Sequence, residues 1–189
     1  MILEDMDFTD FFKHISEIFS GYFSNKETDM LMGFVDVLSD ANFRCYKANM
    51  IVIKSRKAHE DNYKLVSDME WVARSVGEYR VSSKARINLY ISKIRAQSIR
   101  TNSATWVSDD VVYSIGEMMD RLSIETIKRE DFFKNNRPDH MRRASQDISD
   151  RVEKYLRVKL KEIDRKGFYE CIHEQRTYDL EGIVQELAI

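Results

Sequence analysis

The chain has 189 residues, 43% of them hydrophobic and 33% charged, a length at which one domain can bury a substantial core. Thirty Lys and Arg against 32 Asp and Glu give a net charge of −2, which excludes a strong bulk attraction to nucleic acid or anionic membranes. One proline and six glycines are too few for a turn-rich β fold, so the composition favours long helices.

The cysteines and the hydropathy of the chain indicate in which cellular compartment the protein is expected. Cys45 and Cys171 lie far apart and outside any CxxC pattern, which predicts reduced thiols rather than a disulfide framework. The opening residues MILEDMDFTD are acidic where a secretory signal is basic, and no stretch approaches the roughly 20 apolar residues of a membrane span. We therefore expect a cytoplasmic protein without a membrane span or a secretory signal.

Apolar side chains at spacings of three and four predict a first amphipathic helix, and these are Phe8, Phe11, Phe12, Ile15, Ile18, Phe19, Tyr22 and Phe23. A second, shorter helix is expected with Thr28 as its N-cap. Residues 41–76 contain neither proline nor glycine. They predict one long helix, or two nearly collinear helices around a polar interruption at 58–64, with a break at Gly77. A further helix is expected around 87–94.

The polar run 101–105 predicts a loop, and residues 101–108 are a candidate boundary within the chain. Ser108 is expected to cap a helix that stops before Pro138, because the residue preceding proline is disfavoured in the α region. The next helix should begin at Pro138 and end near Gly167, and a last one should span 180–187. The sequence thus predicts an all-α, single-domain helical bundle over residues 1–189, with six to seven helices, one or two of them long.

Charge is unevenly spread along the chain. Residues 1–40 contain nine acidic side chains and two lysines, whereas residues 79–108 contain no acidic side chain. The cations of this second segment are a candidate nucleic-acid-binding set: Arg80, Lys84, Arg86, Lys93, Arg95 and Arg100. The alternative is that they pack beside the acidic N-terminal helices or form a solvated face.

Motifs for metal or catalytic chemistry are sparse. Glu170 and His173 have the i, i+3 spacing of a carboxylate-bridged metal site, but such sites need a second pair like it. Glu117 and Asp120 are spaced to share a helix face and to hold Mg²⁺, but ion pairs from Glu117 to Arg121 and from Glu125 to Arg129 also account for them. We therefore predict no catalytic set, no bound metal and no cofactor.

The segment 114–128 resembles a signature of uncharacterised bacterial helical proteins, roughly G-x-[IML]-[IM]-D-R-L-[ST]-I-x-x-[LI]-K. The triplet His59-Glu60-Asp61 is similar to a W-H-x-E-D motif of that family, and Gly167 followed by residues 176–179 is similar to its C-terminal K-M-Y-N segment. The resemblance implies an α-helical bacterial protein, and some family members lie near glycan-assembly genes. The polar cluster that it singles out is His59, Glu117, Asp120, Arg121 and Lys128.

Three functions remain open on the sequence. The first is a non-enzymatic interaction or adaptor protein, whose aromatic N-terminal helix packs partly against a protein partner or a second copy of the chain. The second is a nucleic-acid-binding module that uses the acid-free segment 79–108. The third is a metal-dependent helical enzyme, or an accessory protein of a glycan-assembly locus, built on Glu117, Asp120, His59 and His173.

Overall fold

The protein is all-helical in the computed structural model, which describes residues 6–58, 63–95 and 114–166. These residues contain five helices and no strand. The helices are α1 (Thr9–Ser20), α2 (Asn25–Ala58), α3 (Tyr63–Arg95), α4 (Ile115–Lys134) and α5 (Asp139–Lys166).

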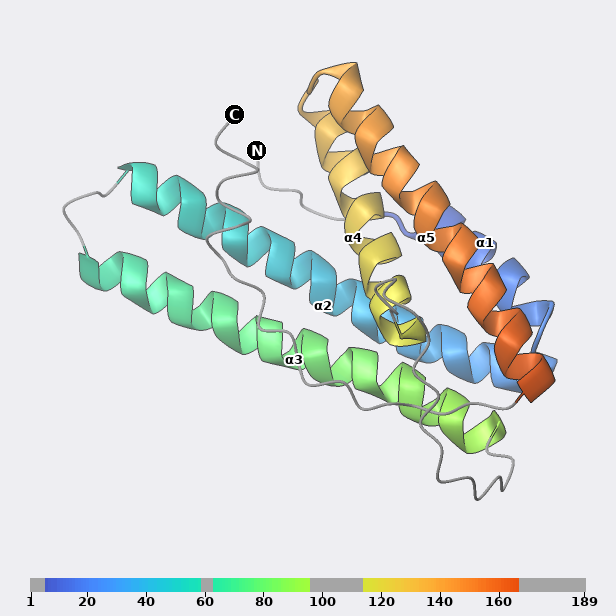
Figure 1. Ribbon diagram of the computed structural model, residues 1–189. Coiled ribbons are helices and arrows are strands. Elements are labelled where there is room, and N and C mark those ends of the chain that lie inside the picture. Colours follow the sequence, from blue (N-terminus) through green and yellow to red (C-terminus); the bar gives the residue numbers. More distant parts are fainter. Residues whose placement is uncertain (1–5, 59–62, 96–113, 167–189) are drawn as a thin grey trace.

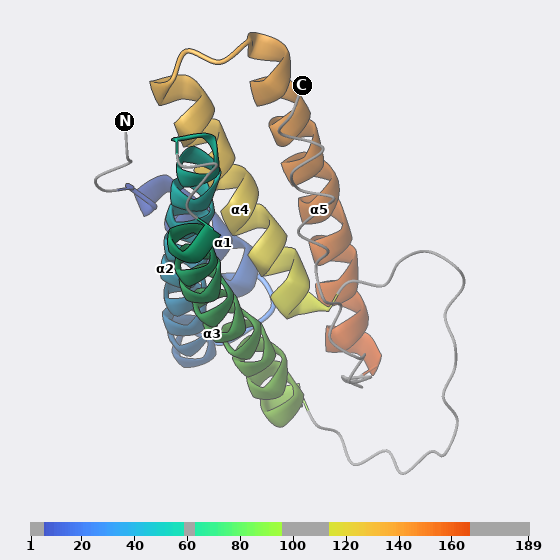
Figure 2. The same ribbon diagram turned by 90° about the vertical axis from the view of Figure 1, so that its left-hand side faces the viewer.

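Two antiparallel hairpins make up most of the structure. The long helices α2 and α3 pair along their length, and α4 pairs with α5 (Figures 1 and 2). Helix α4 also contacts both helices of the first hairpin, so it joins the two hairpins, while α1 packs on α2. None of the helices described combines the length and apolar character needed to cross a bilayer.

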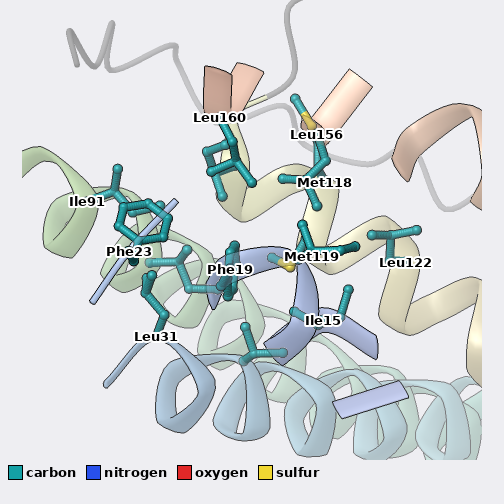
Figure 3. Packing of buried hydrophobic residues seen from close by; sticks show 14 of the residues in the cluster. Ile15, Phe19, Phe23, Leu31, Ile91, Met118, Met119, Leu122, Leu156 and Leu160 are labelled. Carbon is teal, nitrogen blue, oxygen red and sulfur yellow. The ribbon is translucent and has the colours of Figure 1, made fainter. Parts of the chain in front are cut away.

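The apolar core forms where all five helices come together (Figure 3). Ile15 and Phe19 of α1 are at its centre, each at most 1% exposed. The other buried members are Ile18, Phe23, Leu31, Val35, Leu38, Ile87, Ile91, Ile115, Met118, Met119, Leu122, Leu156 and Leu160. The N-terminal helix therefore buries Ile15, Ile18 and Phe19 inside its own chain, while Phe8, Phe11 and Phe12 are partly buried, and the expectation that this helix packs partly against a partner stays a prediction.

Helix α2 is longer than the sequence predicted. Ser24 caps it, because the Ser24 amide donates to Glu27 Oε2 at 2.8 Å and the Glu27 amide donates to Ser24 Oγ at 3.4 Å. Thr28, the predicted cap, is buried one turn into the helix. From this start α2 continues to Ala58 without a break, so the short second helix and the first part of the 41–76 helix are one element.

Helix α3 also differs from the prediction. It passes through Gly77 without a break, because one glycine costs a helix interior only about 1 kcal/mol and packing against α2 offsets this. The alternative of two nearly collinear helices was wrong, since α2 and α3 lie antiparallel (Figure 1). These two corrections lower the number of helices found in the described residues to five.

The turn between α4 and α5 lies at Pro138, as the sequence predicted. Helix α4 ends at Lys134, Asn136 adopts a left-handed φ of 49°, and the Pro138 carbonyl accepts a hydrogen bond from the Met141 amide at 3.0 Å. Pro138 thus lies just before α5 rather than within its first turn. The predicted cap Ser108, the 101–108 loop and the 180–187 helix lie outside the described residues.

Ser114 caps α4 with a reciprocal pair of hydrogen bonds. The Glu117 amide donates to Ser114 Oγ at 3.2 Å, and the Ser114 amide donates to Glu117 Oε2 at 2.8 Å. Asn88 of α3 braces this turn, because its Nδ2 donates to Ser114 Oγ at 3.0 Å and its Oδ1 accepts from the Gly116 amide at 2.7 Å. Here α3 and α4 approach so closely that a Cβ on Gly116 would lie 2.4 Å from the backbone carbonyl oxygen of Lys84.

One prediction follows from this close approach. Gly116→Ala should destabilise the fold by about 1–3 kcal/mol, because backbone cannot yield as a flexible side-chain tip does. Gly77→Ala is the matched control, since its Cβ would meet nothing within 4 Å, and it should stabilise by about 0.5–1 kcal/mol. Urea unfolding followed by circular dichroism measures both, and equal effects of the two substitutions would contradict this account.

A polar contact joins α1 to α5. His14 Nε2 lies 2.7 Å from Glu153 Oε2, and Arg157 Nε donates to Glu153 Oε1 at 2.9 Å. Partial burial by itself raises the pKa of Glu153, but hydrogen bonds from His14 and Arg157 outweigh burial and hold the pKa below its usual value. A carboxyl whose pKa is lowered by folding stabilises the native state above its unfolded pKa, and this contribution is lost as pH falls through the folded pKa.

Glu153→Gln should therefore be destabilising at neutral pH by less than about 1 kcal/mol, because the contact is partly exposed. The difference from the unsubstituted chain should shrink as pH falls below the usual Glu pKa of about 4.3 and through the lower folded pKa of Glu153. Thermal unfolding across this pH range measures it. Glu17→Gln, at an exposed position of α1, provides the baseline, and a Glu153→Gln deficit unchanged at pH 3 would refute the assignment.

Candidate functional site

Asp120 lies at the junction of three helices and is 1% exposed. Arg80 of α3 forms a bidentate ion pair with the Asp120 carboxylate. Its Nε donates to Oδ1 at 2.7 Å, and its terminal nitrogen donates to Oδ2 at 2.6 Å. Lys84 Nζ lies 3.8 Å from the same carboxylate, and Asn42 Nδ2 of α2 donates to the Asp120 carbonyl oxygen at 3.4 Å. The carboxylate thus fixes α4 against both helices of the first hairpin.

Cys45 borders this network from α2. Burial raises the pKa of its thiol, and the neighbouring Arg80 only partly opposes this effect. Asn49 Nδ2 donates to its Sγ at 3.6 Å. A buried thiol with a raised pKa is protonated at neutral pH, so Cys45 lacks the thiolate character of a reactive cysteine.

Glu125 forms a second buried network, between α4 and α5. Its carboxylate pairs with Arg121 Nε at 3.0 Å and Lys128 Nζ at 3.4 Å, and it accepts from Ser145 Oγ at 2.7 Å. Arg129 donates instead to Ser149 Oγ of α5. The predicted pairs Glu117–Arg121 and Glu125–Arg129 are thus replaced, because Glu117 caps α4 and Arg121 reaches one turn forward to Glu125.

Tyr46 makes a third polar link, from α2 to the end of α4. Its hydroxyl donates to Asp131 Oδ2 at 2.9 Å. Burial raises the pKa of Tyr46, and the Asp131 carboxylate that accepts its proton raises it further. The phenol therefore stays protonated and acts as a fixed donor.

These contacts show where the residues of the predicted polar cluster lie. Glu117 caps a helix, Asp120 faces α2 and α3, and Arg121 and Lys128 share Glu125 near α5. The four residues therefore serve different interfaces instead of meeting at one centre. His59 and His173 lie outside the described residues. Within the described parts of the chain, no group of three or more His, Cys, Asp or Glu side chains is placed to hold a metal ion.

The six predicted nucleic-acid-binding cations do not all reach the surface. Arg80 and Lys84 face Asp120, and each side chain is only 13% exposed. Arg86 and Lys93 are exposed on α3. Nothing is described for the side chain of Arg95, and Arg100 is outside the described residues. The buried Asp120 thus pairs with two of the cations that the sequence suggested for phosphate contacts.

The far part of the first hairpin carries several exposed large apolar side chains. We call residues 47–58 of α2 and 63–79 of α3 the arm, because they extend past α1, α4 and α5 (Figure 1). Val52 is the only arm residue that is buried, among those whose side chains are described. Four large apolar side chains form the arm patch, namely Ile51 at 37% exposed, Trp71 at 70%, Val72 at 52% and Tyr79 at 45%.

The periodicity of the sequence does not indicate this patch, because the spacing of Val66, Met69 and Val72 in the predicted 41–76 helix places Val72 on a buried stripe. The stripe does mark the side of α3 that is half-buried, but Val72 lies at its edge and is exposed. Trp71 could have indicated the patch from the sequence, because it lies outside this stripe although it is the largest apolar side chain in the segment. A large aromatic outside the expected buried face marks a candidate contact surface.

Comparisons with protein-family models, with curated proteins and with solved structures find no match to this chain. The site is therefore argued from geometry. Within that geometry, the buried networks hold the helices together, and the arm patch faces outward.

The Asp120 network gives a second stability prediction. Asp120→Asn should cost about 3–5 kcal/mol, because it removes the buried carboxylate that pairs with Arg80 and Lys84. Asp40→Asn is the matched control, because it removes an exposed i, i+4 ion pair with Arg44, and it should cost at most about 1 kcal/mol. Chemical unfolding distinguishes the two, and similar losses would show that the Asp120 pair is not a structural anchor.

Proposed function

We propose that the chain is a non-enzymatic helical interaction protein whose arm binds another protein chain. The observation that supports this proposal most strongly is the arm patch. Large exposed apolar side chains gathered on one element are typical of protein contact surfaces, and aromatic residues such as Trp71 and Tyr79 are enriched among the residues that dominate binding energy.

The packing of the arm also supports binding to another protein chain. Two helices packed on each other cover only one face of each, and the other helices do not extend along the arm (Figure 1). Met50, Ile53, Met69 and Val76 are only half-buried there. A further helical layer supplied by a partner would complete this packing, just as α4 completes it for the rest of the hairpin.

The buried networks favour a structural role for the charged side chains over a catalytic one. Asp120 and Glu125 each form ion pairs with two cationic side chains, and those contacts fix helix positions. Catalytic carboxylates, by contrast, line a cavity that a substrate can enter.

The nucleic-acid interpretation has less support. The cations Arg80 and Lys84 are engaged with Asp120, and the exposed face of the arm on α3 also carries Asp68 and Glu78, which repel phosphate. The net charge of −2 does not offset that repulsion.

Site-specific photo-crosslinking in the cells that express the protein tests the proposal. A benzophenone amino acid at position 72 should give a discrete crosslinked product with a protein, because the arm patch is in contact with its partner. The same probe at exposed Leu89, which is on α3 but outside the arm, is the matched control and should give little product. Equal yields at the two positions, or no product at position 72, would refute the proposal.

A further inference from the structure

We infer that the partner of the arm is a second copy of this chain, so that two arms pack into a four-helix bundle. This inference rests on the proposed function and specifies its partner. It is carried by the distribution of charge and apolar side chains on the arm, which makes the surface complementary to itself.

The two helices of the arm carry different charges. The α2 half of the arm, 47–58, contains four cations and no acidic residue: Lys47, Lys54, Arg56 and Lys57. The α3 half of the arm, 63–79, carries three acids, Asp68, Glu70 and Glu78, against two cations, Lys64 and Arg74. Within one arm, Arg56 and Glu70 already pair across the two helices at 2.5 Å. The same attraction is available between α2 of one copy and α3 of another.

Helical spacing places charges and apolar side chains on common faces. On α2, Lys47, Ile51 and Lys54 are spaced by four and three residues, so they lie along one side. On α3, Asp68, Val72 and the aromatic Tyr79 follow the same rule, at intervals of four and seven. Each face thus presents an apolar position with charge beside it, positive on one helix and negative on the other.

These two faces point to the same side of the arm. Arg44 lies seven residues, two turns, before Ile51, and Tyr79 lies seven residues after Val72, so each pair shares an angular position on its helix. Tyr46 of α2 and Arg80 of α3 both contact α4, and Arg44 and Tyr79 lie two residues and one residue away from them, so neither points toward α4. Ile51 and Val72 are therefore expected side by side on one surface, next to Trp71.

A two-fold axis suits this surface. In a symmetric dimer the same patch meets itself, so the patch must carry both halves of each complementary contact. When the two-fold axis runs along the arms, so that both arms point the same way, α2 of each copy lies over α3 of the other, cations oppose acids on both sides, and the arm patches meet in the middle. A partner carrying charges of one sign would instead be repelled by one of the two helices.

The size of the arm sets the expected affinity. At 1.5 Å per residue, the α3 part of the arm is about 25 Å long. A contact of this length and two helices wide is at the small end of specific interfaces, below about 1,200 Å² in total. We therefore expect a reversible dimer with a dissociation constant in the micromolar range.

Sedimentation velocity of the full chain over about 1–200 µM tests the inference, with micromolar affinity corresponding to about −8 kcal/mol. The unsubstituted chain should shift from monomer to dimer with concentration. Trp71→Ala combined with Val72→Ala should raise the dissociation constant at least tenfold. Leu89→Ala is the matched control, since Leu89 is also exposed and lies 18 residues, five helical turns, from Trp71, yet outside the arm. It should leave the constant unchanged within about twofold.

A charge-exchange experiment shows whether the contact is between copies. Lys47→Glu with Lys54→Glu places acids on both sides of Ile51 on α2, and Asp68→Lys with Glu78→Lys places cations on the Val72 side of α3. Each variant alone should stay monomeric, because its copies repel, whereas an equimolar mixture should form a mixed dimer. Circular dichroism confirms that each variant is folded before the comparison.

The outcomes separate this inference from the proposed function. A chain that stays monomeric to about 200 µM overturns self-association, whereas crosslinking from position 72 to a different protein would still support the arm as a contact surface. A dimer that survives the paired alanine substitutions, or a mixture that remains monomeric, also overturns the arm-to-arm dimer. A crosslinked product with twice the mass of one chain, lost in the same variants, supports both.

Discussion

The ion pair between Arg80 and Asp120 is the contact on which the arrangement of the hairpins depends. Helix α4 is the element that touches both α2–α3 and α5, and Asp120 fixes where along α3 it lies. A buried bidentate pair has one good geometry, so sliding α4 by a turn would leave both charges desolvated and unpaired. Gly116, one turn earlier, lets the two backbones approach closely enough for that geometry.

Once α4 is fixed, the rest of the molecule divides into a packed body and a projecting arm. In the body, α1, α4 and α5 cover the faces that α2 and α3 leave open, and the core residues there are almost fully buried (Figure 3). Past Tyr46 and Arg80, and among the helices that the structure describes, the hairpin has only its own two helices to bury apolar surface. The arm patch exists because α2 and α3 are longer than the helices that pack on them.

The charged residues of the 114–128 segment show how one sequence pattern takes on several structural tasks. Glu117 caps the helix, Asp120 holds α3, and Lys128 helps to neutralise Glu125 beneath α5. Read along the helix, these side chains suggested a metal-binding face. In three dimensions they diverge, because residues spaced over several turns of a helix that is covered on more than one side belong to different neighbours.

The sequence by itself determined the all-helical class and the apolar face of α1, because both follow from local periodicity and from the scarcity of proline and glycine. It also located the turn at Pro138, where the backbone constraint is local. Only the tertiary structure decided that α2 and α3 fold back on each other, that Arg80 and Lys84 turn inward, and that Val72 stays uncovered. These outcomes depend on which helix lies opposite each face. Helical periodicity predicts which face of a helix is apolar, but it does not predict which other helix packs on that face.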